Sequence, residues 1–139
     1  MMKKWVFVIG ALFIIAIACK KSNNTSPAFI GAWQWQYSVG GINVQTISAG
    51  SATVVIQFKS DSTYRILRND TLMDSGVFQV SVNSNGQQIL KLSGIVHTPI
   101  FSMPNGLAFV IQQNQLIAED YLVADGFKHY FKYYPYYVL

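Results

Sequence analysis

From Phe29 onward, apolar and polar residues alternate over short stretches, and clusters of turn-forming residues separate these stretches. In one such stretch, Val54, Ile56 and Phe58 fall on one face of an extended chain and Gln57 falls on the other, because successive strand residues point to opposite faces. Apolar residues do not recur in this part of the chain with the 3.6-residue period of a helix. The pattern therefore predicts an all-β domain.

The alternation predicts about eight strands, and Asn43–Ser48 forms either a ninth strand or part of a long first hairpin. Most connections are short, so consecutive strands should pair antiparallel in up-and-down order. Eight such strands close into a small barrel, which leaves no exposed sheet edge. The alternative is a two-sheet sandwich, which usually needs longer crossing connections, and Gly94–Gly106 is long enough to be one. The expected strands are Ala32–Val39, Thr53–Lys59, Thr63–Arg68, Gly76–Val82, Gln87–Leu92, Leu107–Gln112, Gln115–Val123 and Phe127–Tyr134.

A continuous apolar run stands at the N-terminus, in contrast to the alternating pattern. It follows the basic segment Met1–Lys4 and extends over Trp5–Ala18. A membrane-spanning helix needs about 20 apolar residues, and this shorter run is typical of a secretory signal peptide. The sequence Ala16-Ile17-Ala18-Cys19 resembles the lipobox of bacterial lipoproteins, which implies cleavage before Cys19 and attachment of fatty acids such as palmitate. The alternative is an ordinary signal peptide or membrane anchor in which Cys19 has no special role.

These features divide the chain into a signal peptide, residues 1–18, a lipidated cysteine with a flexible tether, residues 19–27, and a barrel domain, residues 28–139. Acyl chains on Cys19 would hold the mature protein at a membrane surface without a spanning helix. Lys20 stands where an Asp favours inner-membrane retention in the lipoproteins that the signal resembles. The tether also has no acidic cluster resembling a surface-export signal. We therefore expect an outer-membrane protein that faces the periplasm.

The charge is unevenly distributed along the chain. Ten Lys and Arg residues against six Asp and Glu residues give a formal net charge of +4. Lys3, Lys4, Lys20 and Lys21 precede the barrel domain, and ten less these four leaves six basic residues against six acidic ones. A neutral domain has no broad positive face, so we expect no nucleic-acid partner. Cys19 is the only Cys of the chain, which excludes disulfide bonds and thiolate metal sites from the barrel.

Four short motifs in the barrel domain occur in the order and spacing typical of one family. The resemblance is to the lipocalins and their bacterial lipocalin-like relatives. It implies an eight-stranded up-and-down barrel in which Trp33, preceded by Gly31, plugs the closed end, and in which a small apolar molecule binds. The motifs are Gly31-Ala32-Trp33, Phe58-Lys59-Ser60-Asp61-Ser62-Thr63-Tyr64, Gly76-Val77-Phe78 and Asp125-Gly126-Phe127-Lys128-His129-Tyr130-Phe131.

The chain departs from the family pattern in two places. Family members often stack an Arg from the last strand over the Trp, but no Arg follows Arg68, so Lys128 or Lys132 would take that place, or nothing does. Lipocalins proper also carry a helix after the barrel, and with the chain ending at Leu139 we expect none. Large inward candidates could fill a barrel of this size, and they are Phe58, Tyr64, Phe78, Phe109 and Phe131.

Candidate catalytic and metal-binding residues are few. His97 and His129 are far apart and have no other ligand at metal-binding spacing, so we expect no metal, and no sequence motif calls for a cofactor. His129 falls among barrel-facing residues and is interpreted as a hydrogen-bonded wall residue. Glu119 and Asp120 point to opposite faces of a strand and cannot act as an acid–base pair. Either one carboxylate faces inward and needs a partner, or the register turns it outward, which we favour. The remaining aspartates, Asp61, Asp70, Asp74 and Asp125, fall in predicted turns.

Tyrosines are concentrated at the C-terminus, which allows two interpretations. Aromatic platforms bind sugars and proteins, but a last strand that packs and pairs back to the first explains the same residues and is favoured. We expect a non-enzymatic envelope protein that binds a small apolar or amphipathic ligand. The alternative is an interaction module with a filled barrel, and the interior volume separates the two. The tyrosines concerned are Tyr130, Tyr133, Tyr134, Tyr136 and Tyr137.

Overall fold

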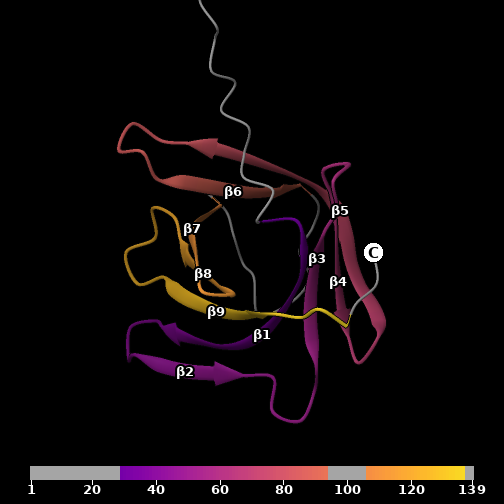
Figure 1. Cartoon of the computed structure of the whole chain (residues 1–139). Helices are drawn as coiled ribbons and strands as arrows, with labels where there is room; N and C mark the ends of the chain where they lie inside the picture. The colour runs from indigo at the N-terminus through magenta and orange to yellow at the C-terminus, as the bar shows by residue number, and fades with distance from the viewer. Residues whose placement is uncertain (1–28, 94–105, 137–139) are drawn as a thin grey trace, which may run out of the picture.

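The computed structural model describes residues 29–93 and 106–136, which form an antiparallel β-barrel (Figure 1). Each strand pairs with its neighbour along the barrel, and β9 pairs with β1 to close it. The described residues contain no α-helix, so the predicted all-β, up-and-down barrel without a C-terminal helix is confirmed. The strands are β1 (Gly31–Gly40), β2 (Gln45–Ser48), β3 (Val54–Phe58), β4 (Thr63–Arg68), β5 (Thr71–Val82), β6 (Gln88–Ser93), β7 (Leu107–Gln112), β8 (Gln115–Asp120) and β9 (Phe127–Tyr133).

The barrel wall has eight strands, and β2 is an addition to it. The first half of β1, Gly31–Gln34, pairs with β3, while the second half, Tyr37–Gly40, pairs with β2 on the same edge. The other edge of β1 pairs with β9 along almost its whole length. The segment Asn43–Ser48 therefore contains a short ninth strand that extends the first hairpin. The predicted signal peptide and Cys19 lie outside the described residues, as does His97.

Two strand boundaries differ from the sequence-based prediction by three residues or more. β5 begins at Thr71, so Asp74 lies in a strand and not in a turn. The turn is formed by Asn69 and Asp70, which both have positive φ (47° and 62°) and make the tight two-residue connection of a hairpin. β8 ends at Asp120, not at Val123 as predicted. The backbone N–H of the next residue, Tyr121, donates to the carbonyl oxygen of Gly106, which precedes the neighbouring strand β7. Turn-forming residues within a strand were the source of the first error.

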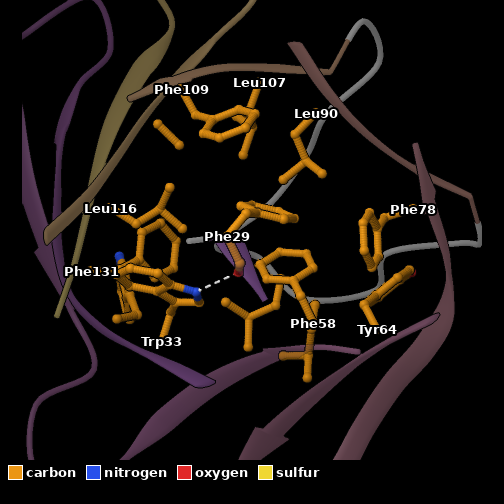
Figure 2. Close-up of a cluster of buried hydrophobic side chains, with 14 of the residues drawn as sticks. Phe29, Trp33, Phe58, Tyr64, Phe78, Leu90, Leu107, Phe109, Leu116 and Phe131 are labelled. Atoms are coloured by element: carbon orange, nitrogen blue, oxygen red, sulfur yellow. Dashed lines mark hydrogen bonds between the residues drawn. The ribbon is translucent and has the colours of Figure 1, made fainter. Parts of the chain in front are cut away.

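The barrel interior is filled by apolar side chains from all around the wall. Phe58, Tyr64, Phe78, Phe109 and Phe131 are buried, as their alternation predicted. Figure 2 shows these side chains pointing from the strands toward the centre. The interior cluster also contains Phe29, Trp33, Trp35, Val54, Ile56, Ile66, Leu90, Leu107, Leu116 and Ala118.

Phe29, which precedes β1, places its ring in the middle of this cluster (Figure 2). Its ring centroid lies 4.1 Å from that of Phe58, 5.0 Å from Phe109 and 5.4 Å from Phe78. The indole Nε1–H of Trp33 donates to the Phe29 carbonyl oxygen at 3.0 Å. A ligand in the central space that the lipocalin resemblance assigns to it would have to displace the Phe29 ring.

Trp33 is buried at the end of the barrel where β1 begins, with 2% of its surface exposed. The ring of Tyr133 meets it edge-on, with centroids 5.4 Å apart. Lys132 lies next to Tyr133 and opposite Gln34 on the outward face, so strand alternation excludes it from the place over Trp33. Gly31 has a φ of 137°, and a Cβ there would lie 3.0 Å from the Tyr133 ring, which explains the glycine in the Gly-x-Trp motif.

Candidate functional site

A groove with a volume of about 610 Å³ lies on the outside of the barrel. It runs between the β5–β6 turn and the outer faces of β7, β8 and β9, and its lining also includes Phe109 and Ile111 from the inward face of β7. It forms because β6 pairs with β7 only over Gln88–Leu90. The β5–β6 turn, which precedes Gln88, is therefore not paired with the part of β7 that follows Phe109. We call this the outer groove, and its lining includes Gln87, Ala108, Val110, Ile117, Glu119 and Lys128.

The outer groove combines an apolar floor with charged groups at one side. Val110 and Ile117 are paired across β7 and β8 and both face outward. Beside them, Lys128 Nζ lies 3.3 Å from Glu119 Oε2, and the two side chains are 44% and 58% exposed. An ion pair as exposed as this contributes about 0–1 kcal/mol. Either charge can therefore turn toward a ligand at little cost in folding free energy.

The outer groove continues into a second section, of about 530 Å³, next to the β8–β9 loop. The two sections share Gln87, Ala108 and Glu119. The second section is completed by residues 120–124, which we call the loop end of the groove. Leu122 and Val123 in this loop are 76% and 39% exposed, so apolar side chains border the groove here as well.

A pair of stacked tyrosines lies beside the outer groove. Tyr130 on β9 is opposite Ile117 of the groove and also next to Tyr37 on β1. The two Tyr rings have centroids 4.6 Å apart and planes 23° apart, and Tyr37 is 40% exposed. The C-terminal tyrosines of β9 thus pair back to the first strand, as the favoured interpretation held. Tyr136 is 83% exposed, and Tyr137 lies outside the described residues.

A chain of hydrogen bonds crosses the inside of the barrel wall from β1 to the β8–β9 loop. Trp35 Nε1–H donates to Ser38 Oγ at 2.9 Å, and Ser38 Oγ lies 2.7 Å from His129 Nδ1. His129 Nε2 lies 3.2 Å from Asp120 Oδ1, and Asp120 Oδ2 accepts the backbone N–H of Phe127 at 2.8 Å. We call these five groups the polar chain. Ser38 and His129 are each 2% exposed.

The direction of each hydrogen bond in the polar chain follows from the chemistry of its ends. An ionised carboxylate only accepts hydrogen bonds, so the His129 proton belongs on Nε2, facing Asp120. In a neutral imidazole, Nδ1 is then an acceptor, and Ser38 must donate its hydroxyl proton to it. Burial holds the pKa of His129 below its ordinary 6.5, against the raising effect of Asp120. A neutral ring at pH 7 is consistent with this order of donors.

The structure confirms one sequence-based prediction about these residues and corrects another. His129 is a hydrogen-bonded wall residue, as predicted. Asp120, for which an outward register was favoured, instead lies on the inward face with Leu116 and Ala118. An inward carboxylate is acceptable because His129 and the Phe127 N–H satisfy both of its oxygens.

The sequence pattern did not indicate Ser38 as a residue of the polar chain. A three-residue spacing should put Trp35 and Ser38 on opposite faces of a strand. The register of β1 against β9 shifts between Trp35 and Tyr37, which inserts Gln36 as an extra residue. This bulge returns Ser38 to the inward face. No alternation rule predicts the bulge, and a Gln followed by Tyr gives no turn signal from which to infer it.

The order Ser–His–Asp is that of a hydrolase triad, but its surroundings differ from those of a nucleophile. The Ser38 hydroxyl accepts a hydrogen bond from Trp35 and belongs to a residue that is 2% exposed. In this conformation a substrate carbonyl does not reach Oγ. The arrangement satisfies its own buried polar groups, so its visible role is to join β1, β8 and β9.

One inward polar atom elsewhere in the barrel has no such partner. Asp74 lies on β5 opposite Ile66, and its Oδ2 is buried without a hydrogen-bond partner among the described residues. Its other oxygen accepts the backbone N–H of Ser75 at 2.7 Å. The nearby Tyr64 has its pKa raised, first by burial and then by the charge of Asp74.

Neither the protein-family models nor the curated proteins match the chain. In residues 29–93 and 106–136, no three His, Cys, Asp or Glu side chains come close enough together to hold a metal ion. A search of the same described residues finds no helix with the length and hydropathy needed to cross a membrane. The geometry of the described residues provides two features, the ligand-sized outer groove and the polar chain that ends at its loop end.

Proposed function

We propose that the protein is an envelope lipoprotein that binds a small amphipathic ligand in the outer groove, without catalysis. The observation that carries the proposal is the outer groove, whose volume of about 610 Å³ lies within the range of about 300–1,000 Å³ that small-molecule sites occupy. A filled centre is the outcome that the interaction module predicted, because the Phe29 ring and its neighbours occupy it. We therefore propose ligand binding in the outer groove and not in the barrel interior.

The lining of the outer groove supports a ligand with an apolar body and a charged or strongly polar end. Val110 and Ile117 offer apolar contact, while Glu119 and Lys128 offer one charge of each sign. A ligand carboxylate or phosphate would replace Glu119 as the partner of Lys128, and an ammonium group would replace Lys128. The side-chain amide of Gln87 can donate and accept hydrogen bonds at the opposite side of the groove.

The anchor is part of the proposal and rests on the lipobox-like sequence before Cys19. Two or three acyl chains give stable attachment, because each buried CH₂ contributes about 0.8 kcal/mol. The absence of Asp at position 20 supports an outer-membrane location, and the absence of an acidic cluster in the tether supports the face toward the periplasm. Growth with labelled fatty acid should mark the wild-type protein, and Cys19→Ala should remove the label. Equal labelling of both proteins would refute the anchor.

Native mass spectrometry of the protein purified from its own cells tests ligand binding. We expect a bound species of small-molecule mass on the wild type that is lost from Val110→Lys, because the new side chain places a charge on the apolar floor. The matched control is Val77→Lys, since Val77 is equally exposed (48% against 44%) but lies outside the groove. Retention of the ligand by Val110→Lys, or no ligand on the wild type, would contradict the proposal.

A second candidate function is contact with a protein or glycan through the stacked pair Tyr37 and Tyr130. The stack is partly exposed and adjoins Ile117 of the groove, and tyrosine combines a rigid apolar ring with a polar hydroxyl. Tyr37→Ala distinguishes the two functions. It should abolish glycan-array or partner binding under the second function, and it should leave the small-molecule complex of the wild type unchanged under the first.

A further inference from the structure

We propose that the polar chain, which runs from Trp35 through Ser38, His129 and Asp120 to the Phe127 N–H, rearranges when His129 is protonated and thereby sets the position of the loop end of the outer groove. We call this device the latch. The latch acts on residues 121–126, and its effect on ligand binding rests on the proposed function.

The Asp120 carboxylate holds the β8–β9 loop at both of its ends. Asp120 is the last residue of β8, and its Oδ2 accepts the backbone N–H of Phe127, the first residue of β9. Residues 121–126 lie between them, and Asp120, Leu122 and Val123 line the loop end of the groove. The position of the Asp120 side chain therefore determines where the loop leaves and rejoins the wall.

The packing around this carboxylate is tight. A Cβ added at Gly126 would lie 2.7 Å from Asp120 Cβ and 3.3 Å from Asp120 Oδ2. The loop backbone therefore runs directly against the Asp120 side chain, with no side chain at position 126 to separate them. A change in the direction of the carboxylate must move the loop as well, because close-packed groups do not deform independently.

With a neutral His129, each donor of the polar chain has an acceptor. Nε2–H donates to Asp120, Nδ1 accepts from Ser38, and Ser38 Oγ accepts from Trp35. The hydrogen bond from Trp35 occupies one lone pair of Ser38 Oγ, so the Ser38 hydroxyl proton points toward His129. Every donor then faces an acceptor from β1 to the loop, so the neutral ring holds Asp120 in its observed place.

A proton on Nδ1 would reverse the direction of the hydrogen bond between His129 and Ser38, so that His129 donates and Ser38 accepts. Both ring nitrogens would then donate, and Ser38 Oγ would have to accept from His129 and Trp35 together. The Ser38 hydroxyl proton would need a new acceptor, although the residue is only 2% exposed. A buried donor without an acceptor is unfavourable, because it has lost its bond to water without gaining another. The proton at the same time strengthens the attraction between His129 and Asp120.

Of the two hydrogen-bond partners of His129 described above, Asp120 is the one that carries a charge. On β1, the neighbours Trp35 and Ser38 are uncharged. On β8 and β9, Glu119 and Lys128 point to the outer face, where they pair with each other. A protonated His129 is thus drawn more strongly toward Asp120, while the Ser38 hydroxyl proton loses its acceptor, so the latch shifts toward the loop. Burial delays the change to a pH below the ordinary pKa of 6.5.

Backbone amide chemical shifts of the full-length, ¹⁵N-labelled protein test the latch between about pH 8 and about pH 5, the range over which histidine titrates. We expect the amides of Leu122, Val123 and Phe127 to titrate together with one midpoint below 6.5. His129→Gln keeps an N–H donor near Asp120 but cannot take up a proton, so these amides should stop titrating. The matched control His97→Gln removes the other histidine of the chain and should leave the titration unchanged.

Ser38→Ala provides a second test that does not depend on replacing His129. The variant removes the partner of His129 Nδ1 in both protonation states, so the shared midpoint should move away from its wild-type value. Loop amides that do not titrate in the wild type, that still titrate in His129→Gln, or whose midpoint is unmoved in Ser38→Ala would each overturn the latch. Loop amides that titrate while no ligand binds at any pH would instead refute the proposed function and leave the latch standing.

Discussion

The two ends of the β1–β9 pair are joined from inside the barrel in different ways. At one end, Phe29 and Trp33 are held by ring contacts and one hydrogen bond, and the groups involved do not titrate. At the other end, Ser38 and His129 are held by the polar chain. The same two strands are therefore fixed by apolar burial where the chain enters the barrel and by proton-bearing groups where the β8–β9 loop begins.

This difference separates a permanent part of the fold from an adjustable one. Burial of an aromatic ring does not depend on pH, and it is lost when the ring leaves the interior. The polar chain depends on whether the His129 ring carries one proton or two, so it can change while the barrel stays closed. The adjustable end is also the one that borders the outer groove, through Asp120. Variants at each end should therefore differ in the size and in the pH dependence of their effects.

The largest effect is expected at the permanent end, from Phe29→Ala. Replacing a fully buried Phe by Ala costs about 3–5 kcal/mol of unfolding free energy, and Phe29 contacts three other rings in the interior cluster. Urea denaturation measures the loss, which should be the same at neutral and acidic pH. Phe29→Leu is the control, since it keeps most of the apolar volume and should lose much less.

A loss below about 1 kcal/mol in Phe29→Ala would contradict the central position of the ring, because that is less than the removal of a few buried methylene groups costs. It would also reopen the barrel interior as a place for a ligand. A pH-dependent loss would contradict the contrast between the two ends.

A smaller effect is expected at the adjustable end, from Ser38→Ala at neutral pH. The variant leaves Trp35 Nε1–H without its acceptor and His129 Nδ1 without its donor. Unpaired buried polar groups of this kind cost about 1–3 kcal/mol. The matched control is Ser48→Ala on β2, whose residues are all exposed, and it should change the unfolding free energy by less than about 0.5 kcal/mol. Equal effects of the two substitutions would show that Ser38 is not part of a saturated chain.

The pH dependence of stability follows from the direction of the His129 pKa. Burial lowers this pKa in the folded protein below 6.5, so the unfolded chain binds more protons than the folded one as the pH falls through 6.5. The free energy of unfolding should therefore be fully present above that pH and decrease as the pH falls toward the folded value. Urea denaturation at several pH values should show this decrease in the wild type and a flatter profile in His129→Gln. An identical decrease in both proteins would assign it to other groups.

The sequence predicted the parts of this molecule that follow from alternation. The strands, the closed barrel and the burial of Phe58, Tyr64 and Phe131 depend on the two-residue period of an extended chain. Ser38 could not be placed, because the bulge at Gln36 reverses its face. Phe29 stands before the first strand, so no period applied to it.

The candidate site was less predictable than the fold, for physical reasons. The outer groove exists because the β5–β6 hairpin separates from β7 after a short paired stretch. That separation depends on how the whole wall twists, and no local pattern of residues encodes it. Asp120 was assigned the wrong face, because its partners His129 and the Phe127 N–H come from another strand. A buried carboxylate is acceptable only once those partners are known.

The smallest effect on stability is expected in the outer groove itself, from Lys128→Gln. The ion pair with Glu119 is exposed at both side chains, so the free energy of unfolding should fall by less than about 1 kcal/mol. Ligand binding should respond more strongly: a bound anion would lose its charge partner and with it at least about tenfold in affinity, which corresponds to about 1.4 kcal/mol. Glu119→Gln is the complementary variant, because it frees Lys128 and should strengthen the binding of an anion. If the ligand is a cation, the two variants exchange their effects, and native mass spectrometry with both proteins therefore identifies its sign. Unchanged binding in both would place the ligand away from this pair, and the outer groove would then be set apart from the rest of the barrel surface by its shape alone.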